Sequence, residues 1–129
     1  MIIEENNVTA KIEGITTYYR DTKILQVTLL LTSGLHAGTK VLDKVSFYEG
    51  HRLNWKYHAL RNSAGLKFPI EFEVLGDVQT SLIGKEVVID LSEFKYTNYQ
   101  GDPDSCQSVK YVLKFSQNNY NNINKIRKV

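Results

Sequence analysis

The stretch that decides the fold reads Val8-Thr9-Ala10-Lys11-Ile12-Glu13-Gly14-Ile15-Thr16-Thr17-Tyr18-Tyr19. Its first half alternates apolar and polar residues, as in a strand that buries one face. Gly14 interrupts this alternation, and a glycine inside a strand usually marks a bulge or a sharp bend. The β-branched residues after Gly14 resume an extended pattern. We therefore predict one long first strand that bends at Gly14.

Four further strand patterns follow this one. A turn at residues 20–23 leads into a second strand, whose buried face carries Leu25, Val27, Leu29 and Leu31. The third strand is predicted from Thr39 to Tyr48, with Val41, Val45 and Phe47 inward, and strict alternation would turn Asp43 inward as well. The fourth carries Val87, Ile89 and Leu91, and the fifth carries Val109, Tyr111, Leu113 and Phe115. A long hairpin loop is predicted from Tyr96 to Ser105, because this segment contains Gly101-Asp102-Pro103.

A helical period separates the third and fourth strands. Leu53, Tyr57, Leu60 and Ala64 fall on one stripe of an α-helix, and Gly65 stands where a helix commonly ends. A short turn is expected near residues 77–82. The predicted order is therefore β-β-β-α-β-β: an all-β fold forming a five-stranded OB-type barrel, with one helix between strands three and four.

The length of 129 residues fits a single domain, which we place at residues 1–116. Residues 117–129 form an asparagine-rich, basic C-terminal tail whose composition is typical of disorder. The longest apolar run, Val27 to Leu31, is too short to span a membrane, so no membrane association is expected. The N-terminus does not resemble a secretory signal. The single cysteine, Cys106, cannot form an internal disulfide, so we expect a cytoplasmic protein.

Enzymatic signals are weak. The three histidines and the cysteine lack the spacing of a zinc site, and no glycine-rich phosphate loop is present. Cys106 has no motif around it that would make it a nucleophile. We therefore expect a protein that is not an enzyme and that holds neither a cofactor nor a metal.

Aromatic and basic residues gather at the two loops with which OB domains hold oligonucleotides. Stacking rings capture bases through their π-faces, and nearby cations neutralise phosphates. The predicted nucleic-acid-binding residues come from the first hairpin, the third strand and the last hairpin: Tyr18, Tyr19, Arg20, Lys23, Lys40, Lys44, Tyr48, Lys95, Tyr96 and Tyr99. The structural alternative is that the tyrosines pack the barrel ends while the lysines form an ordinary soluble surface. The net charge of +2 does not decide between the two.

The sequence also resembles a family of phage and prophage single-stranded DNA-binding proteins, often described only as a domain of unknown function. The matching stretches are residues 38–45, 60–65, 82–87 and 109–112. The resemblance implies binding of single-stranded DNA during phage replication or recombination in the host cytoplasm, beside a recombinase or replication protein. Many single-strand binders end in an acidic tail that recruits partners, whereas this chain ends in a basic one.

Other functions stay open at this point. RNA and a second copy of the chain are further candidate partners. A protein-interaction module would use Trp55 and the loop from Leu66 to Leu75 to contact a phage recombinase. A carbohydrate binder would use the tyrosines as platforms for sugar rings. Fold alone does not separate these functions.

Overall fold

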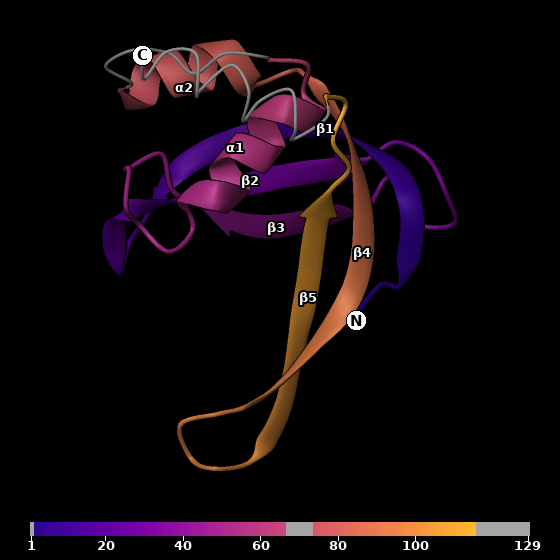
Figure 1. Cartoon of the computed structure of the whole chain (residues 1–129). Coiled ribbons are helices and arrows are strands. Elements are labelled where there is room, and N and C mark those ends of the chain that lie inside the picture. Colours follow the sequence, from indigo (N-terminus) through magenta and orange to yellow (C-terminus); the bar gives the residue numbers. More distant parts are fainter. Residues whose placement is uncertain (1, 67–73, 116–129) are drawn as a thin grey trace.

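The computed structural model describes residues 2–66 and 74–115. Five strands form one antiparallel sheet, and along the chain two helices follow the third strand and precede the fourth (Figure 1). The elements are β1 (Glu5–Tyr18), β2 (Asp21–Leu31), β3 (Lys40–Val45), α1 (Asn54–Ser63), α2 (Leu75–Leu82), β4 (Glu86–Thr97) and β5 (Pro103–Tyr111).

The sheet order is β3-β2-β1-β4-β5, so β3 and β5 are its two edges. In the part of the chain that the structure describes, no backbone ladder joins these edges, and the sheet is not a closed barrel. The prediction of a five-stranded, mostly β fold is confirmed. The prediction of one helix is wrong, because α2 stands where a turn was expected. Only Val78 and Leu82 of α2 are fully buried, and two positions of one stripe are too few to show a helical period.

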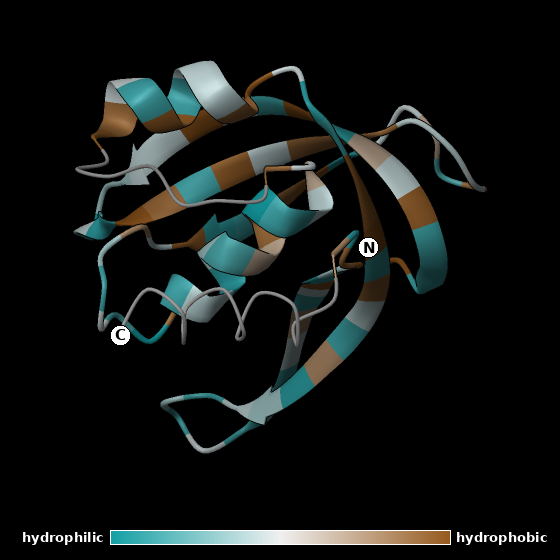
Figure 2. Ribbon diagram, turned by 45° about the horizontal axis from the view of Figure 1, so that its top comes forward, coloured by the Kyte–Doolittle hydropathy of each residue, from teal (hydrophilic) through white to brown (hydrophobic). Residues whose placement is uncertain are grey.

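The core follows the alternation of the strands, which is visible as alternating hydropathy in Figure 2. Ile12 pairs with Leu29 and Gly14 pairs with Thr28, so Glu13 is an extra residue in β1. This bulge confirms the predicted bend. It also switches the buried positions of β1 from the even-numbered Val8, Ala10 and Ile12 to the odd-numbered Ile15.

Several predicted boundaries are wrong. The first turn is shorter than predicted, because β2 begins at Asp21, and β3 ends at Val45. β5 ends at Tyr111, so Leu113 and Phe115 lie beyond it. The side chain of Asn62 in α1 accepts hydrogen bonds from the backbone N–H groups of Lys114 and Phe115 and so diverts the chain from the sheet. The predicted tail at residues 117–129 lies outside the described residues.

The last hairpin is longer than the sequence suggested. Phe94, Lys95 and Tyr96 lie on β4, paired with Cys106, Ser105 and Asp104 of β5. Only residues 98–102 form the connecting loop. Asn98 stabilises this loop, because its side-chain oxygen accepts hydrogen bonds from the N–H groups of Gln100 and Asp102. The turn residues therefore occupy half of the predicted loop.

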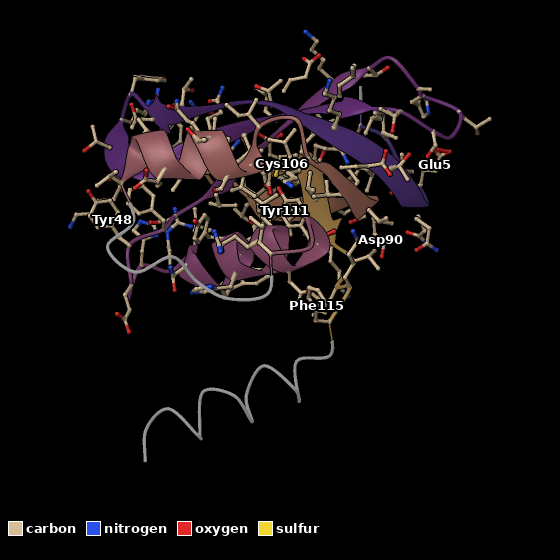
Figure 3. The ribbon with its side chains drawn as sticks, turned by 90° about the horizontal axis from the view of Figure 1, so that it is seen from above. Glu5, Tyr48, Asp90, Cys106, Tyr111 and Phe115 are labelled. Carbon is tan, nitrogen blue, oxygen red and sulfur yellow. The ribbon has the colours of Figure 1, made fainter. Side chains whose placement is uncertain are left out.

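Asp43 joins the two edges of the sheet from inside. Its buried carboxylate accepts a 2.7 Å hydrogen bond from the Tyr111 hydroxyl on β5 and pairs with the Lys56 ammonium on α1. Figure 3 shows Tyr111 in the interior, between the sheet and α1. Burial raises the pKa of Tyr111 well above its usual range, and the charge of Asp43 adds to this effect. Asp43 therefore lies inward, as strict alternation along the third strand requires.

Tyr111→Phe should lower the free energy of unfolding by about 2 kcal/mol, since a hydrogen bond to a charged group contributes about 1.5–3 kcal/mol. Tyr96→Phe is the matched control, because the Tyr96 hydroxyl also bonds an aspartate, Asp104, but at an exposed site and at 3.3 Å. It should change stability by less than about 0.5 kcal/mol. Urea denaturation measures both, and equal losses would show that the Asp43 bond does not hold the sheet edges.

Candidate nucleic-acid interface

Eight of the ten predicted site residues fall on two separate surfaces, and Lys40 and Tyr48 lie beside the first of them. The first, which we call the turn surface, surrounds the β1–β2 turn and consists of Tyr18, Tyr19, Arg20, Lys23 and Lys44. The second is the arm, residues 92–108 of the β4–β5 hairpin, which projects from the rest of the sheet in Figure 1. The two surfaces differ in geometry and in charge.

Strand register brings Lys44 to Tyr18. Lys44 of β3 pairs with Gln26 of β2, and Gln26 pairs with Thr16 of β1, so these residues form a row on the outer face. Tyr18 faces the same way as Thr16, two residues further along β1. The Lys44 ammonium lies 4.0 Å from the centroid of the Tyr18 ring, within cation–π range.

The turn itself adds a second pair of this kind. The Arg20 guanidinium lies 5.4 Å from the centroid of the Tyr19 ring, and the Tyr18 and Tyr19 centroids are 5.0 Å apart. Tyr19 is 79% exposed. Two rings and two cations therefore stand side by side at one exposed turn, which favours the binding interpretation of these tyrosines over barrel-end packing.

The cations also change the chemistry of Tyr18. A hydrogen bond from Lys44 is the main cause of a lowered pKa of Tyr18, because it stabilises the phenolate. Burial opposes this effect, and the charges of Lys44 and Arg20 add to it. The shift follows from Lys44 lying at the ring.

Two further predicted cations, Lys40 and Lys23, lie near these rings and differ in their partners. The Lys40 ammonium forms a 3.0 Å ion pair with Glu13, the extra residue of the bulge. Lys23 is exposed, and its backbone N–H donates to the Asp21 carboxylate. Asp21 itself lies 3.8 Å from His51. The turn surface is therefore basic, with one carboxylate at its edge.

The loop from Ser46 to Leu53 lies against the turn surface. The Ser46 hydroxyl donates a 2.6 Å hydrogen bond to the Lys23 carbonyl oxygen and thus fixes the loop to β2. Within this loop Tyr48 stacks on Phe47, with centroids 4.9 Å apart. Figure 3 shows Tyr48 at the edge of the molecule, at the opposite end from Glu5. The predicted residue Tyr48 is therefore exposed beside the turn surface.

Leu42 is a surface residue that sequence reasoning missed. It is 55% exposed on the outer face of β3, between Lys40 and Lys44, and its cross-strand neighbours are Thr28 and then Gly14. Thr28 is small and Gly14 has no side chain, so Leu42 is the main apolar group between the two lysines. Strand alternation predicts the outward position of Leu42, but only the register shows what lies beside it.

The arm carries the remaining predicted residues. Phe94 and Tyr96 stack on one face of it, with centroids 6.1 Å apart and an interplanar angle of 16°. Tyr99 in the loop is 96% exposed. The Lys95 ammonium lies 3.9 Å from the Glu93 carboxylate. Burial raises the pKa of Tyr96, and the charge of Asp104 adds to the rise.

The described residues include no group of three or more histidine, cysteine, aspartate or glutamate side chains that could hold a metal ion. No helix in residues 2–66 and 74–115 is long and apolar enough to cross a membrane. No protein-family model matches the chain, and no curated protein matches it either. Evidence for a function must therefore come from the sequence and from the geometry of the surfaces described above.

Lys44→Gln should raise the pKa of Tyr18 toward its ordinary value of 10.0, because the hydrogen bond that stabilises the phenolate is lost. In the wild type, Tyr18 should therefore deprotonate at a lower pH than in the variant. An NMR titration of tyrosine ring carbons, with Tyr18→Phe for assignment, measures this difference. Lys40→Gln is the control, since Lys40 pairs with Glu13 on the same face. Equal shifts in both variants would contradict the direct contact.

Proposed function

We propose that the protein binds single-stranded DNA without strong sequence preference, at the turn surface and along the outer face of β3. The observation that carries this proposal is the pair of cation–ring contacts, Lys44 with Tyr18 and Arg20 with Tyr19. An exposed ring offers a base a stacking partner, and the neighbouring cation offers its phosphate a counter-charge. Neither contact reads a base edge, so tolerance of sequence follows.

The phosphate path of the proposal runs along β3. Lys44 and Lys40 lie on the same face of this strand, and Leu42 provides an apolar contact between them. A phosphate that approaches Lys40 competes with Glu13 for its ammonium. Lys40 therefore contributes less than Lys44 in this proposal.

The architecture supports an OB-type assignment as part of the proposal. The strand order β3-β2-β1-β4-β5 becomes that of a five-stranded OB barrel when β3 and β5 lie together along one seam. Here the Tyr111–Asp43 hydrogen bond spans that seam in place of a backbone ladder. OB domains bind oligonucleotides on the face of strands two and three, which is the face that carries Lys40 and Lys44.

The cellular role extends the proposal further. The sequence resemblance suggests a non-catalytic phage protein that protects or presents single strands during replication or recombination, in the host cytoplasm. A phage recombinase or replication protein would then be its partner. These assignments rest on the resemblance and on the chemistry of the turn surface.

The arm has a different place in this proposal. Asp102 and Asp104 repel phosphates, so we assign the phosphate path to the turn surface and β3. The second clamp predicted at Lys95, Tyr96 and Tyr99 stays a prediction, in which the arm rings would stack on bases.

Trp55 favours a second candidate function, a protein-interaction module. It is 65% exposed on α1, although tryptophan is usually largely buried. The loop from Leu66 to Leu75, which was predicted to act with Trp55, lies outside the described residues at positions 67–73. An exposed tryptophan is a common anchor of protein interfaces.

Single-stranded DNA should bind much more tightly than a duplex of equal length, because a duplex hides the faces on which the rings would stack. If about four phosphates are neutralised by Arg20, Lys23, Lys40 and Lys44, log K should fall with log salt with a slope of roughly −3. Fluorescence anisotropy with labelled dT, rU and duplex oligomers at two salt concentrations measures both. Equal affinity for single strand and duplex would reject stacking, and a flat salt dependence would reject the phosphate path.

Tyr18→Ala and Tyr19→Ala should each weaken binding of dT oligomers by about 1–3 kcal/mol, the usual contribution of one stacked base. Leu35→Ala is the control, since Leu35 is an exposed apolar residue, at 90% compared with 79% for Tyr19, and lies in the β2–β3 loop. Tyr96→Ala and Tyr99→Ala, measured beside them, decide whether the predicted second clamp exists. Thermal melts accompany each isotherm. Early melting of the turn variants with normal binding by their folded fraction would mean that these rings pack the fold instead.

A further inference from the structure

The arm is a two-stranded ribbon that extends past the rest of the sheet. β4 pairs with β1 only from Glu86 to Leu91, and from Ser92 onward its one strand partner is β5. Figure 1 shows this part of the hairpin projecting from the body. An isolated two-stranded hairpin is marginally stable in water, and its open edges are ready to contact another chain. These features are typical of a hairpin that is stabilised by contact with a partner.

One face of the arm is aromatic. Phe94 and Tyr96 are two residues apart on β4, so their side chains leave the same face, and their rings are close to parallel. Phe94 is 57% exposed. This spacing presents two rings in a row, as an extended single strand presents successive bases.

The charge of the arm is opposite to that of the turn surface. Residues 92–108 contain the acidic residues Glu93, Asp102 and Asp104 and one basic residue, Lys95, which leaves a net charge of −2 in a chain whose total is +2. The turn surface carries the cations Arg20, Lys23 and Lys44. Among the described residues, no hydrogen bond, ion pair or ring contact links the arm to the turn surface of its own molecule. The two complementary surfaces are thus available to different molecules.

We propose that the arm of one copy docks on the turn surface of a second copy and there imitates single-stranded DNA. Its rings take the place of bases, and the carboxylates of Asp102 and Asp104 take the place of phosphates. The inference rests on the proposed function, since it assigns the same surface to the arm and to DNA. Each copy has one arm and one turn surface, so the contact joins unlike surfaces and can repeat. DNA and self-association then exclude one another.

The first test is the mass of the full chain in low salt without DNA, measured by sedimentation over a range of concentrations. The wild type should self-associate. Asp102→Asn with Asp104→Asn should weaken this association about tenfold, because two charge contacts are lost while the shape is kept. Asp77→Asn with Glu86→Gln is the control, since it removes two exposed acidic charges outside the arm. A monomeric wild type, or equal association in both variants, overturns the proposal.

The second test exchanges the charges. A variant with Asp102→Lys and Asp104→Lys and a variant with Arg20→Glu and Lys44→Glu should each be monomeric alone, because like charges meet in each. Mixed, they should associate in alternation, because the lysine arm of the first meets the acidic turn surface of the second, and the acidic arm of the second meets the basic turn surface of the first. Failure of the mixture to associate, with both variants folded by circular dichroism, overturns the assignment of these two surfaces.

The third test adds a dT oligomer short enough to hold one protein. The oligomer should dissociate the wild-type assembly, and an assembly that binds it without dissociating overturns the imitation of DNA. Failure of the proposed function is visible separately. In the Asp102→Asn and Asp104→Asn variant the arm competes about tenfold less for the turn surface, so failure of this variant to bind dT would reject DNA binding whatever the sedimentation result.

Discussion

The rest of the structure depends on the hydrogen bond and the ion pair that the buried carboxylate of Asp43 forms. Asp43 lies on the edge strand β3 and bonds Tyr111 on the other edge and Lys56 on α1. An unpaired carboxylate would be costly at this depth, so both partners must stay in place. Since Asp43 points inward, its neighbours Leu42 and Lys44 must point outward. The contact that holds the two sheet edges together therefore also fixes which residues of β3 lie on the proposed binding face.

The bulge in β1 likewise decides which residues of β1 reach the outer face of the sheet. Before Glu13 the even-numbered residues of β1 are buried, and after it the odd-numbered Ile15 is buried. A one-residue shift of register exchanges the two faces of a strand. If Glu13 were paired regularly in the ladder, the even-numbered residues would stay buried, and Tyr18 would point to the interior, away from Lys44. A Cβ at Gly14 would make only ordinary contact with Thr28, at 4.0 Å, so the register shift depends on the extra residue and not on a close approach at the glycine.

These two constraints explain how far the sequence could predict the structure. The Leu and Val alternation identified the five strands, and Gly14 identified the bulge, because both signals are local. The partners of Asp43 lie 13 and 68 residues away, so alternation could place its side chain inside but could not say what neutralises it. The arm was shortened in the prediction because Gly101 and Pro103 signal a turn, whereas cross-strand pairing extends the strands almost up to it. Glu13, the ion-pair partner of Lys40, is the extra residue of the same register shift, so local sequence patterns could not predict this pair either.

The distribution of charge, rather than its total, carries the functional argument. A net charge of +2 is too small to indicate nucleic acid, and composition alone would suggest a neutral surface. Folding separates the charges, because the register places Lys40 and Lys44 on one face while the hairpin carries Asp102 and Asp104 away from it. Screening in salt limits each charge to roughly 8–10 Å, so separated clusters act on their own neighbours and not through the total. A nearly neutral chain can thus carry both a basic surface, which we propose binds DNA, and an acidic arm, which we propose binds the basic surface of a second copy.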